Sequence, residues 1–184
     1  CKVSRVIGID VDAAGSTNQS VDSFALIQDV SHWPAESASV DLAVADYVLE
    51  HVPTPAAFFG EARRVLKPGG YLCLRTPNSW SYISLVARLV PNRFHARVTG
   101  LAQKGRQEKD VFPTVYKCNR PSVIRRNLRE AGFEGVVLQT ESEPAYLSFS
   151  RLAYRLGVVW HAVCPPTFRS TLQVFARKGE DPSS

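Results

Sequence analysis

Three aspartates stand at the ends of three successive apolar runs, namely Asp10, Asp29 and Asp46. In folds with a parallel sheet, ligands bind at the carboxyl ends of the strands. A carboxylate there can accept two hydrogen bonds from a ribose diol, a role that suits Asp10. Asp29 can accept from an adenine amine, with Val30 beside the base. For any one aspartate a solvated rim position is the alternative, but the three together predict a site for an adenosine-containing cofactor.

The elements that must position these aspartates follow from the apolar pattern. Continuous short apolar runs suit strands buried on both faces, and they alternate with amphipathic helical segments. Strands are predicted at 5–10, 24–29, 40–46, 71–76, 135–140 and 172–177, and helices at 54–67 and 121–131. Thr54 with Pro55 is a favourable helix start, and Pro68-Gly69-Gly70 is expected to stop that helix and turn the chain. This alternation predicts an α/β fold with a mostly parallel sheet.

The composition is that of one soluble globular domain. The chain has 184 residues, 45% of them hydrophobic and 21% charged, with a formal net charge of +5. Such a mild charge does not single out nucleic acid as a partner. The four cysteines are scattered, which favours free thiols in a reducing compartment over disulfides or a zinc site. We therefore expect a cytoplasmic protein with no bound metal and no nucleic-acid partner.

Five segments carry a resemblance to a known family. They are Ile9-Asp10, Gln28-Asp29-Val30, Val40-Asp41-Leu42, Leu49-Glu50-His51-Val52 and Arg64-Val65-Leu66-Lys67-Pro68-Gly69-Gly70. In these segments the chain resembles the class I S-adenosylmethionine-dependent methyltransferases, and within them the type 11 methyltransferase-domain group. The resemblance is strong over residues 5–78 and weaker beyond.

The resemblance implies a Rossmann-like three-layer α/β/α sandwich, its sheet mostly parallel with an antiparallel last strand. The implied cofactor is S-adenosyl-L-methionine. Asp10 would hold its ribose, Asp29 and Val30 would line the adenine site, and Asp46 with Tyr47 would border the methionine end. The family's first strand and glycine motif are not found here. We therefore expect residues 1–184 to form a single methyltransferase domain lacking both.

The implied reaction is methyl transfer to a small or lipid-like acceptor at an oxygen. His51 is the candidate catalytic base, with a structural role at the strand-to-helix turn as an equal alternative. The signature of enzymes that methylate nucleic-acid amino groups is absent, because the corresponding segment reads Ala45-Asp46-Tyr47-Val48. Two further alternatives are a truncated or degenerate domain without catalysis and a nicotinamide-dependent oxidoreductase. An antiparallel last strand would argue against the oxidoreductase.

Two insertions, at about 79–118 and 144–166, are expected to cap the acceptor side. The first should contain an apolar helix at 82–90 and a basic loop at 104–109. The second is rich in apolar residues and carries Arg151 and Arg155. It is too short and too charged for a membrane span. A helix packed on the sheet is the favoured interpretation, and peripheral membrane contact or a cover over a lipid-like acceptor is the alternative.

Overall fold

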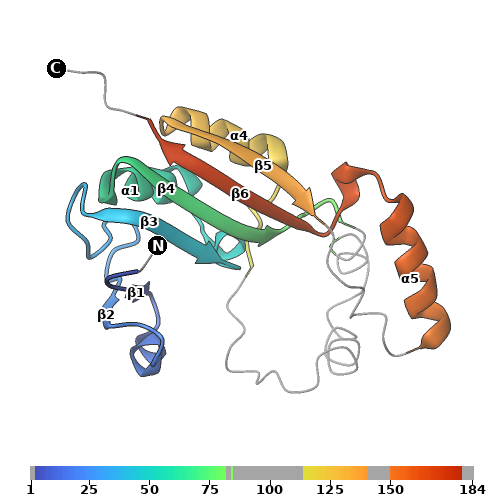
Figure 1. Cartoon of the computed structure of the whole chain (residues 1–184), viewed down its shortest axis with the longest axis horizontal. Coiled ribbons are helices and arrows are strands. Elements are labelled where there is room, and N and C mark those ends of the chain that lie inside the picture. The colour runs from blue at the N-terminus through green and yellow to red at the C-terminus, as the bar shows by residue number, and fades with distance from the viewer. Residues whose placement is uncertain (1–2, 82–83, 85–113, 141–149, 180–184) are drawn as a thin grey trace.

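The computed structural model describes residues 3–81, 84, 114–140 and 150–179 (Figure 1). Apart from Ser84, the predicted helix at 82–90 lies outside these residues, and so does the basic loop at 104–109. The strands are β1 (Ile7–Asp10), β2 (Ser23–Leu26), β3 (Val40–Asp46), β4 (Leu66–Pro77), β5 (Phe133–Thr140) and β6 (Thr171–Lys178). The α-helices are α1 (Pro55–Val65), α4 (Pro121–Glu130) and α5 (Arg151–Val163), and short 3₁₀ helices are η1 (Ala13–Thr17), η2 (Leu49–His51) and η5 (Pro166–Phe168).

The strands form two sheets. The larger has the order β3-β4-β6-β5, with β3 parallel to β4 and β6 antiparallel to both of its neighbours. The smaller pairs β1 with β2 in parallel. The mixed α/β fold and its antiparallel last strand are therefore confirmed. That strand also argues against the oxidoreductase alternative, since a dehydrogenase sheet normally continues parallel.

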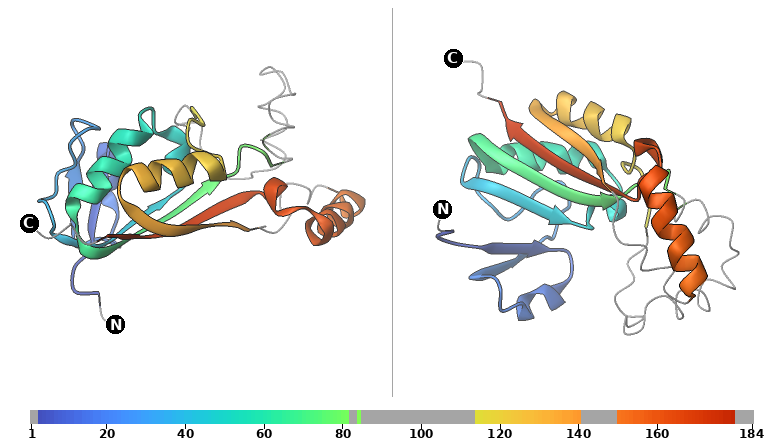
Figure 2. Two further views of the ribbon diagram at one scale, coloured as in Figure 1. Left: turned by 90° about the horizontal axis from the view of Figure 1, so that it is seen from above. Right: turned by 45° about the vertical axis from the view of Figure 1, so that its right-hand side comes forward.

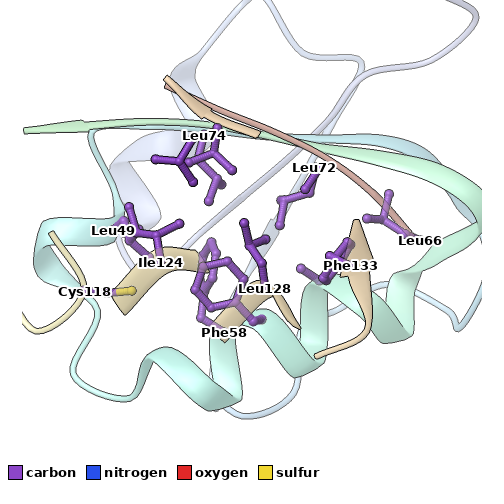
Figure 3. Packing of buried hydrophobic residues seen from close by; sticks show 14 of the residues in the cluster. Leu49, Phe58, Leu66, Leu72, Leu74, Cys118, Ile124, Leu128 and Phe133 are labelled. Atoms are coloured by element: carbon purple, nitrogen blue, oxygen red, sulfur yellow. The ribbon is translucent and has the colours of Figure 1, made fainter. Parts of the chain in front are cut away.

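One face of the larger sheet is covered by α1 and α4, which lie side by side on it (Figure 2). The hydrophobic core fills the space between these two helices and the sheet (Figure 3). Phe59 of α1, Ile124 of α4, Leu72 of β4 and Val174 of β6 are fully buried there. Each such side chain stabilises the fold by about 1.5–3 kcal/mol through removal of apolar surface from water.

The opposite face of the larger sheet exposes apolar side chains. Because strand residues alternate between faces, the neighbours of the buried residues point away from α1 and α4. They include Leu42, Val44, Tyr71, Val136, Leu138 and Phe175, all exposed. The described residues thus form two layers, where the resemblance predicts three. Within the described residues, the connection from β1 to β2 contains only the five-residue η1 and adds no α-helix to a third layer.

Two predicted strand boundaries are wrong by three residues or more, each at a local turn or irregularity. β2 ends at Leu26, not at Asp29, since the Asp29 side chain accepts the Ser31 backbone N–H at 2.8 Å and closes a turn. β4 begins at Leu66, five residues before the predicted start. The segment after Leu66 forms an irregularity in the pairing with β3, and Gly69 adopts a φ of 76°, which glycine tolerates.

The start of α1 also differs in detail from the prediction. Pro55 occupies the first turn as expected, but the Thr54 side chain makes no capping hydrogen bond. Instead the Thr54 backbone carbonyl accepts the Phe58 N–H at 3.2 Å. The helix therefore begins through backbone geometry and the fixed φ of proline.

A buried carboxylate ties α1 to the loop before β3. Glu61 Oε2 accepts the Trp33 backbone N–H and the Arg64 Nη2–H, both at 2.7 Å. Arg64 also donates to the carbonyls of Trp33 and Ala35 at 2.9 Å. The hydrogen bond from Arg64, with the one from Trp33, outweighs desolvation and holds the pKa of Glu61 below its ordinary value.

This lowered pKa makes a testable contribution to stability. A carboxylate with a depressed folded-state pKa stabilises the fold above its unfolded value and loses that contribution as the pH falls through the folded value. We expect the stability difference between the wild type and Glu61→Gln to be full at pH 7 and to shrink below about pH 4.5, the ordinary glutamate pKa. Urea unfolding across pH measures it. Glu130→Gln, at a mostly exposed glutamate of α4, is the control. Equal pH slopes for the two variants would contradict the tether.

Two glycines give a matched test of the packing. A Cβ at Gly135 would lie 2.5 Å from the Phe175 carbonyl oxygen, whereas a Cβ at Gly60 of α1 would meet nothing within 4 Å. We expect Gly135→Ala to destabilise the protein by about 1–3 kcal/mol through overpacking. Gly60→Ala should stabilise it by about 0.5–1 kcal/mol through helix propensity. Thermal unfolding measures both, and a stabilising Gly135→Ala would contradict the β5–β6 register.

Candidate functional site

An ion pair joins the carboxyl ends of β3 and β4. Asp46, the last residue of β3, lies opposite Arg75 in the parallel register. Arg75 Nε donates to Asp46 Oδ1 at 2.5 Å and Nη2 donates to Oδ2 at 2.6 Å. This bidentate contact raises the pKa of Arg75 above its ordinary value. Both side chains are half exposed, so the pair faces solvent and can meet a ligand.

Tyr47 completes this cluster. Its backbone has a φ of 53°, in the left-handed region that is strained for a tyrosine, and its N–H donates to the Arg75 carbonyl at 2.8 Å. The Arg75 guanidinium carbon lies 5.0 Å from the Tyr47 ring centroid, within cation–π range. Strain of this kind persists where surrounding contacts enforce it, and it clusters at functional sites.

The sequence predicts Asp46 and Tyr47 at the site but not Arg75. Arg75 could have been found from the sequence, because it is a charged residue in the otherwise mostly apolar strand Tyr71–Thr76. Asp46 and Arg75 also border a groove on the exposed sheet face, whose walls include Val44, Cys73 and Phe175. The charged pair therefore lies at one end of an apolar surface.

A buried polar network lies beside this pair. Glu50, Thr76 and Asn119 are each at most 5% exposed. Thr76 Oγ1 donates to Glu50 Oε2 at 3.0 Å, and Asn119 Nδ2 donates to Thr76 Oγ1 at 2.6 Å and to the Pro77 carbonyl at 3.1 Å. Buried polar groups are costly without such partners. The network thus fixes the end of β4 against η2 and residue 119, which are far apart in the sequence.

The Glu50 backbone extends the same network. Its carbonyl accepts N–H groups from Val115 at 2.8 Å and Tyr116 at 3.1 Å. Glu50 and Asn119 were not predicted as site residues. Glu50 stands inside the Leu49-Glu50-His51-Val52 motif, and its place there was the signal, whereas nothing in the sequence marks Asn119.

His51 follows Glu50 in η2 and is partly exposed. Its backbone N–H donates to the Val48 carbonyl at 2.9 Å. The network around Glu50 therefore fixes the backbone that carries the imidazole, four residues after Tyr47. This position suits a base at the strand ends and equally a structural residue of the turn, so the two alternatives remain.

Asp10 and Asp29 lie on the smaller sheet or just after it. Asp10 ends β1 and is exposed, and its Oδ1 accepts the Asp12 N–H at 3.0 Å. Asp29 lies three residues past β2, and its Oδ1 also accepts the Ser31 hydroxyl. Hydrogen bonds from Ser31 hold the pKa of Asp29 below its ordinary value. Within the described residues no hydrogen bond joins this pair of aspartates to the Asp46 cluster.

Other site chemistries find little support in the described part of the chain. There, no cluster of three or more His, Cys, Asp or Glu side chains forms that could hold a metal ion. Within the residues that the structure describes, Cys73, Cys118 and Cys164 form no disulfide. Burial raises the pKa of Cys118 to about 12, so this thiol is not poised as a nucleophile.

Comparisons with known proteins find methyltransferases among those that this chain resembles. The family model described as "Methyltransferase domain" matches residues 1–74. The chain is 33% identical over 187 residues to a trans-aconitate 2-methyltransferase of Azoarcus sp. (strain BH72), covering 89% of this chain and 71% of that protein. It is 30% identical over 112 residues to a ubiquinone biosynthesis O-methyltransferase of Marinobacter nauticus, covering 59% of this chain and 41% of that protein.

Solved structures share the fold. A possible histamine N-methyltransferase of Thermotoga maritima matches with a TM-score of 0.57 at 19% identity, covering 94% of this chain and 72% of that one. Two other curated relatives are much longer, and the chain spans only 25% and 39% of their lengths. The chain belongs to the class I S-adenosylmethionine-dependent methyltransferases, and the cofactor of that family is S-adenosylmethionine.

The residues present fit this cofactor unequally. The exposed Asp10 carboxylate makes one hydrogen bond within the described residues, which leaves acceptor positions for a ribose diol. Val30 is exposed and available for contact with a base. Asp29 is engaged in its own turn, and Asp46 is paired with Arg75. Each carboxylate oxygen has two lone pairs, so Asp46 can accept a further hydrogen bond while it stays paired.

The buried network gives a prediction of its own. Thr76→Val keeps the side-chain volume but removes the hydroxyl that donates to Glu50 and accepts from Asn119. We expect a loss of about 1–3 kcal/mol in unfolding free energy for each group left unsatisfied. Thr76→Ser keeps the hydroxyl and is the control. Chemical denaturation measures both, and equal stability of the Val and Ser variants would contradict the network.

Proposed function

We propose that the protein to which this chain belongs transfers a methyl group from S-adenosylmethionine to a small or lipid-like acceptor at an oxygen. Family membership supports the reaction class, and the relative named as an O-methyltransferase supports the acceptor atom. The observation that carries the proposal is the exposed Asp10 carboxylate at the end of β1, with unused acceptor capacity.

When bound, S-adenosylmethionine supplies a methyl group on a positively charged sulfur, already activated for displacement. The chain's own residues have to bind and align. Asp10 accepts from the ribose hydroxyls, and Val30 contacts the base. Asp46 and Tyr47, held by Arg75, border the methionine end. Alignment of this kind contributes about 7–11 kcal/mol to lowering a bimolecular barrier.

An oxygen acceptor that carries a proton needs a group to take it. His51 serves as that base in our proposal, since a neutral imidazole nitrogen can accept a proton. Glu50 holds η2 against β4 through Thr76 and thereby fixes the backbone next to His51. Its role is to position the imidazole, and the stated alternative is that His51 only stabilises the turn.

The proposal also includes a strand that joins the two sheets. β1 and β3 belong to different sheets, and both β1–β2 and β3–β4 are parallel pairs. β1 lies on the side of the smaller sheet nearer to β3 (Figures 1 and 2). In our proposal, one further strand, supplied by a longer form of the protein, lies between β1 and β3. It would pair with both of these strands and complete the cofactor site. The chain covers 25% and 39% of two longer relatives, which leaves room for such a strand in proteins of that length.

Calorimetric titration with S-adenosylhomocysteine tests the cofactor role. In the longer protein, Asp10→Ala should weaken binding by roughly 1.5–3 kcal/mol per charge-assisted hydrogen bond lost. Asp41→Ala is the control, since Asp41 is exposed and pairs with Lys67 at the other end of β3. Unchanged affinity in Asp10→Ala would refute the ribose role.

The same titration of this chain separates the remaining parts. Binding by the longer protein but not by residues 1–184 supports the joining strand, and binding by both refutes its necessity. If neither binds, the proposal of an active methyltransferase is refuted, and the alternative of a degenerate, non-catalytic domain is favoured.

A further inference from the structure

The helix α5 stands apart from the core of the molecule. Figures 1 and 2 show it beyond the ends of β5 and β6, away from α1 and α4. No described side chain of α5 belongs to the buried core cluster. The interpretation favoured from sequence, a helix packed on the sheet, is therefore wrong, because η5 and Pro165 lead the chain from α5 back to β6 at the sheet's end.

The apolar residues of α5 form one exposed stripe. Leu152, Leu156, Val159 and Val163 are 68%, 61%, 60% and 69% exposed. Their spacing of four, three and four residues places them on a single helix face. The opposite face holds the buried Gly157, with Tyr154 and His161 partly buried. The helix thus rests on the protein by one side and presents apolar side chains on the other.

The charges of α5 are all of one sign. Arg151 and Arg155 are exposed and lie one turn apart beside the stripe, and residues 151–163 contain no acidic residue. Trp160, also exposed, flanks the other side of the stripe. An apolar stripe edged by arginines and an aromatic ring is the pattern of helices that lie in the interface of an anionic membrane.

We propose that α5 binds the surface of membranes that contain anionic lipid, with its stripe among the acyl chains and Arg151 and Arg155 at the headgroups. The charge favours this occupant over a second copy of the chain. Two copies of α5 pairing in parallel through their stripes would bring like-charged arginines together. In either direction of pairing, residues 151–163 offer those arginines no acidic partner. Moreover, 13 residues make a helix of about 20 Å, under two heptads, whereas stable coiled coils run longer.

This mode of attachment is peripheral. Among the described residues no helix is long and apolar enough to cross a bilayer. Attachment through one short stripe and two arginines should be reversible and should weaken as salt screens the charges. The inference does not depend on the proposed methyl transfer.

Flotation with lipid vesicles tests this inference. We expect the wild-type chain to bind vesicles of phosphatidylcholine with roughly 30% phosphatidylglycerol, and to bind pure phosphatidylcholine far more weakly. Arg151→Gln with Arg155→Gln should lower the partition coefficient roughly 25-fold, about fivefold for each arginine near an anionic surface. Leu156→Gln with Val159→Gln should abolish binding.

Two double variants serve as matched controls. Arg126→Gln with Arg129→Gln removes the same charge from the exposed surface of α4, and Val136→Gln with Leu138→Gln removes exposed apolar side chains from β5. Both should bind as the wild type does, and thermal unfolding checks that every variant is folded. Binding that the α5 variants leave unchanged would overturn the inference. So would an absence of binding to anionic vesicles, or a dimer in lipid-free solution that the α5 variants dissociate.

Discussion

The hydrogen-bonded ladders along β4 are the constraint on which the larger sheet depends. β4 pairs in parallel with β3 along one edge and antiparallel with β6 along the other. Its alternating side chains place Leu72 and Leu74 under the helices and direct Tyr71 and Arg75 to the opposite face. A shift of one residue would exchange those faces. The core and the candidate site therefore share one register, and neither can change without the other.

That register also assembles the site from distant segments. Near the carboxyl end of β4, Arg75 pairs with Asp46 on one face of the sheet, and Thr76 donates a hydrogen bond to Glu50 on the other face. The first contact orients a carboxylate that stays open to solvent, and the second anchors the turn that carries His51. A shallow, exposed ion pair contributes little to stability. The Asp46–Arg75 pair instead orients the Asp46 carboxylate. The buried hydrogen bond between Thr76 and Glu50 fixes η2 against β4.

The sequence predicts the parts of this structure that depend on local pattern. It predicts the helices at 54–67 and 121–131 and the strand-end position of Asp46, because period and turn residues reveal these features. The antiparallel direction of β6 was expected only from the family resemblance. It places Asp29 at a strand end because the local turn that this side chain closes with Ser31 went unrecognised. It misses Arg75 and Asn119 because their partners, Asp46 and Thr76, lie 29 and 43 residues away and meet them only through tertiary contacts. The exposure of α5 was missed for the same reason, since an apolar stripe does not reveal what it faces.

The central proposal is that S-adenosylmethionine binds at the carboxyl ends of β1 and β3. The most direct measurement is a crystal structure of the longer protein with S-adenosylhomocysteine. Our account predicts the ribose hydroxyls within hydrogen-bonding distance of the Asp10 carboxylate, and the amino-acid end beside Asp46 and Tyr47. A cofactor bound elsewhere, with Asp10 still open to solvent, would contradict it.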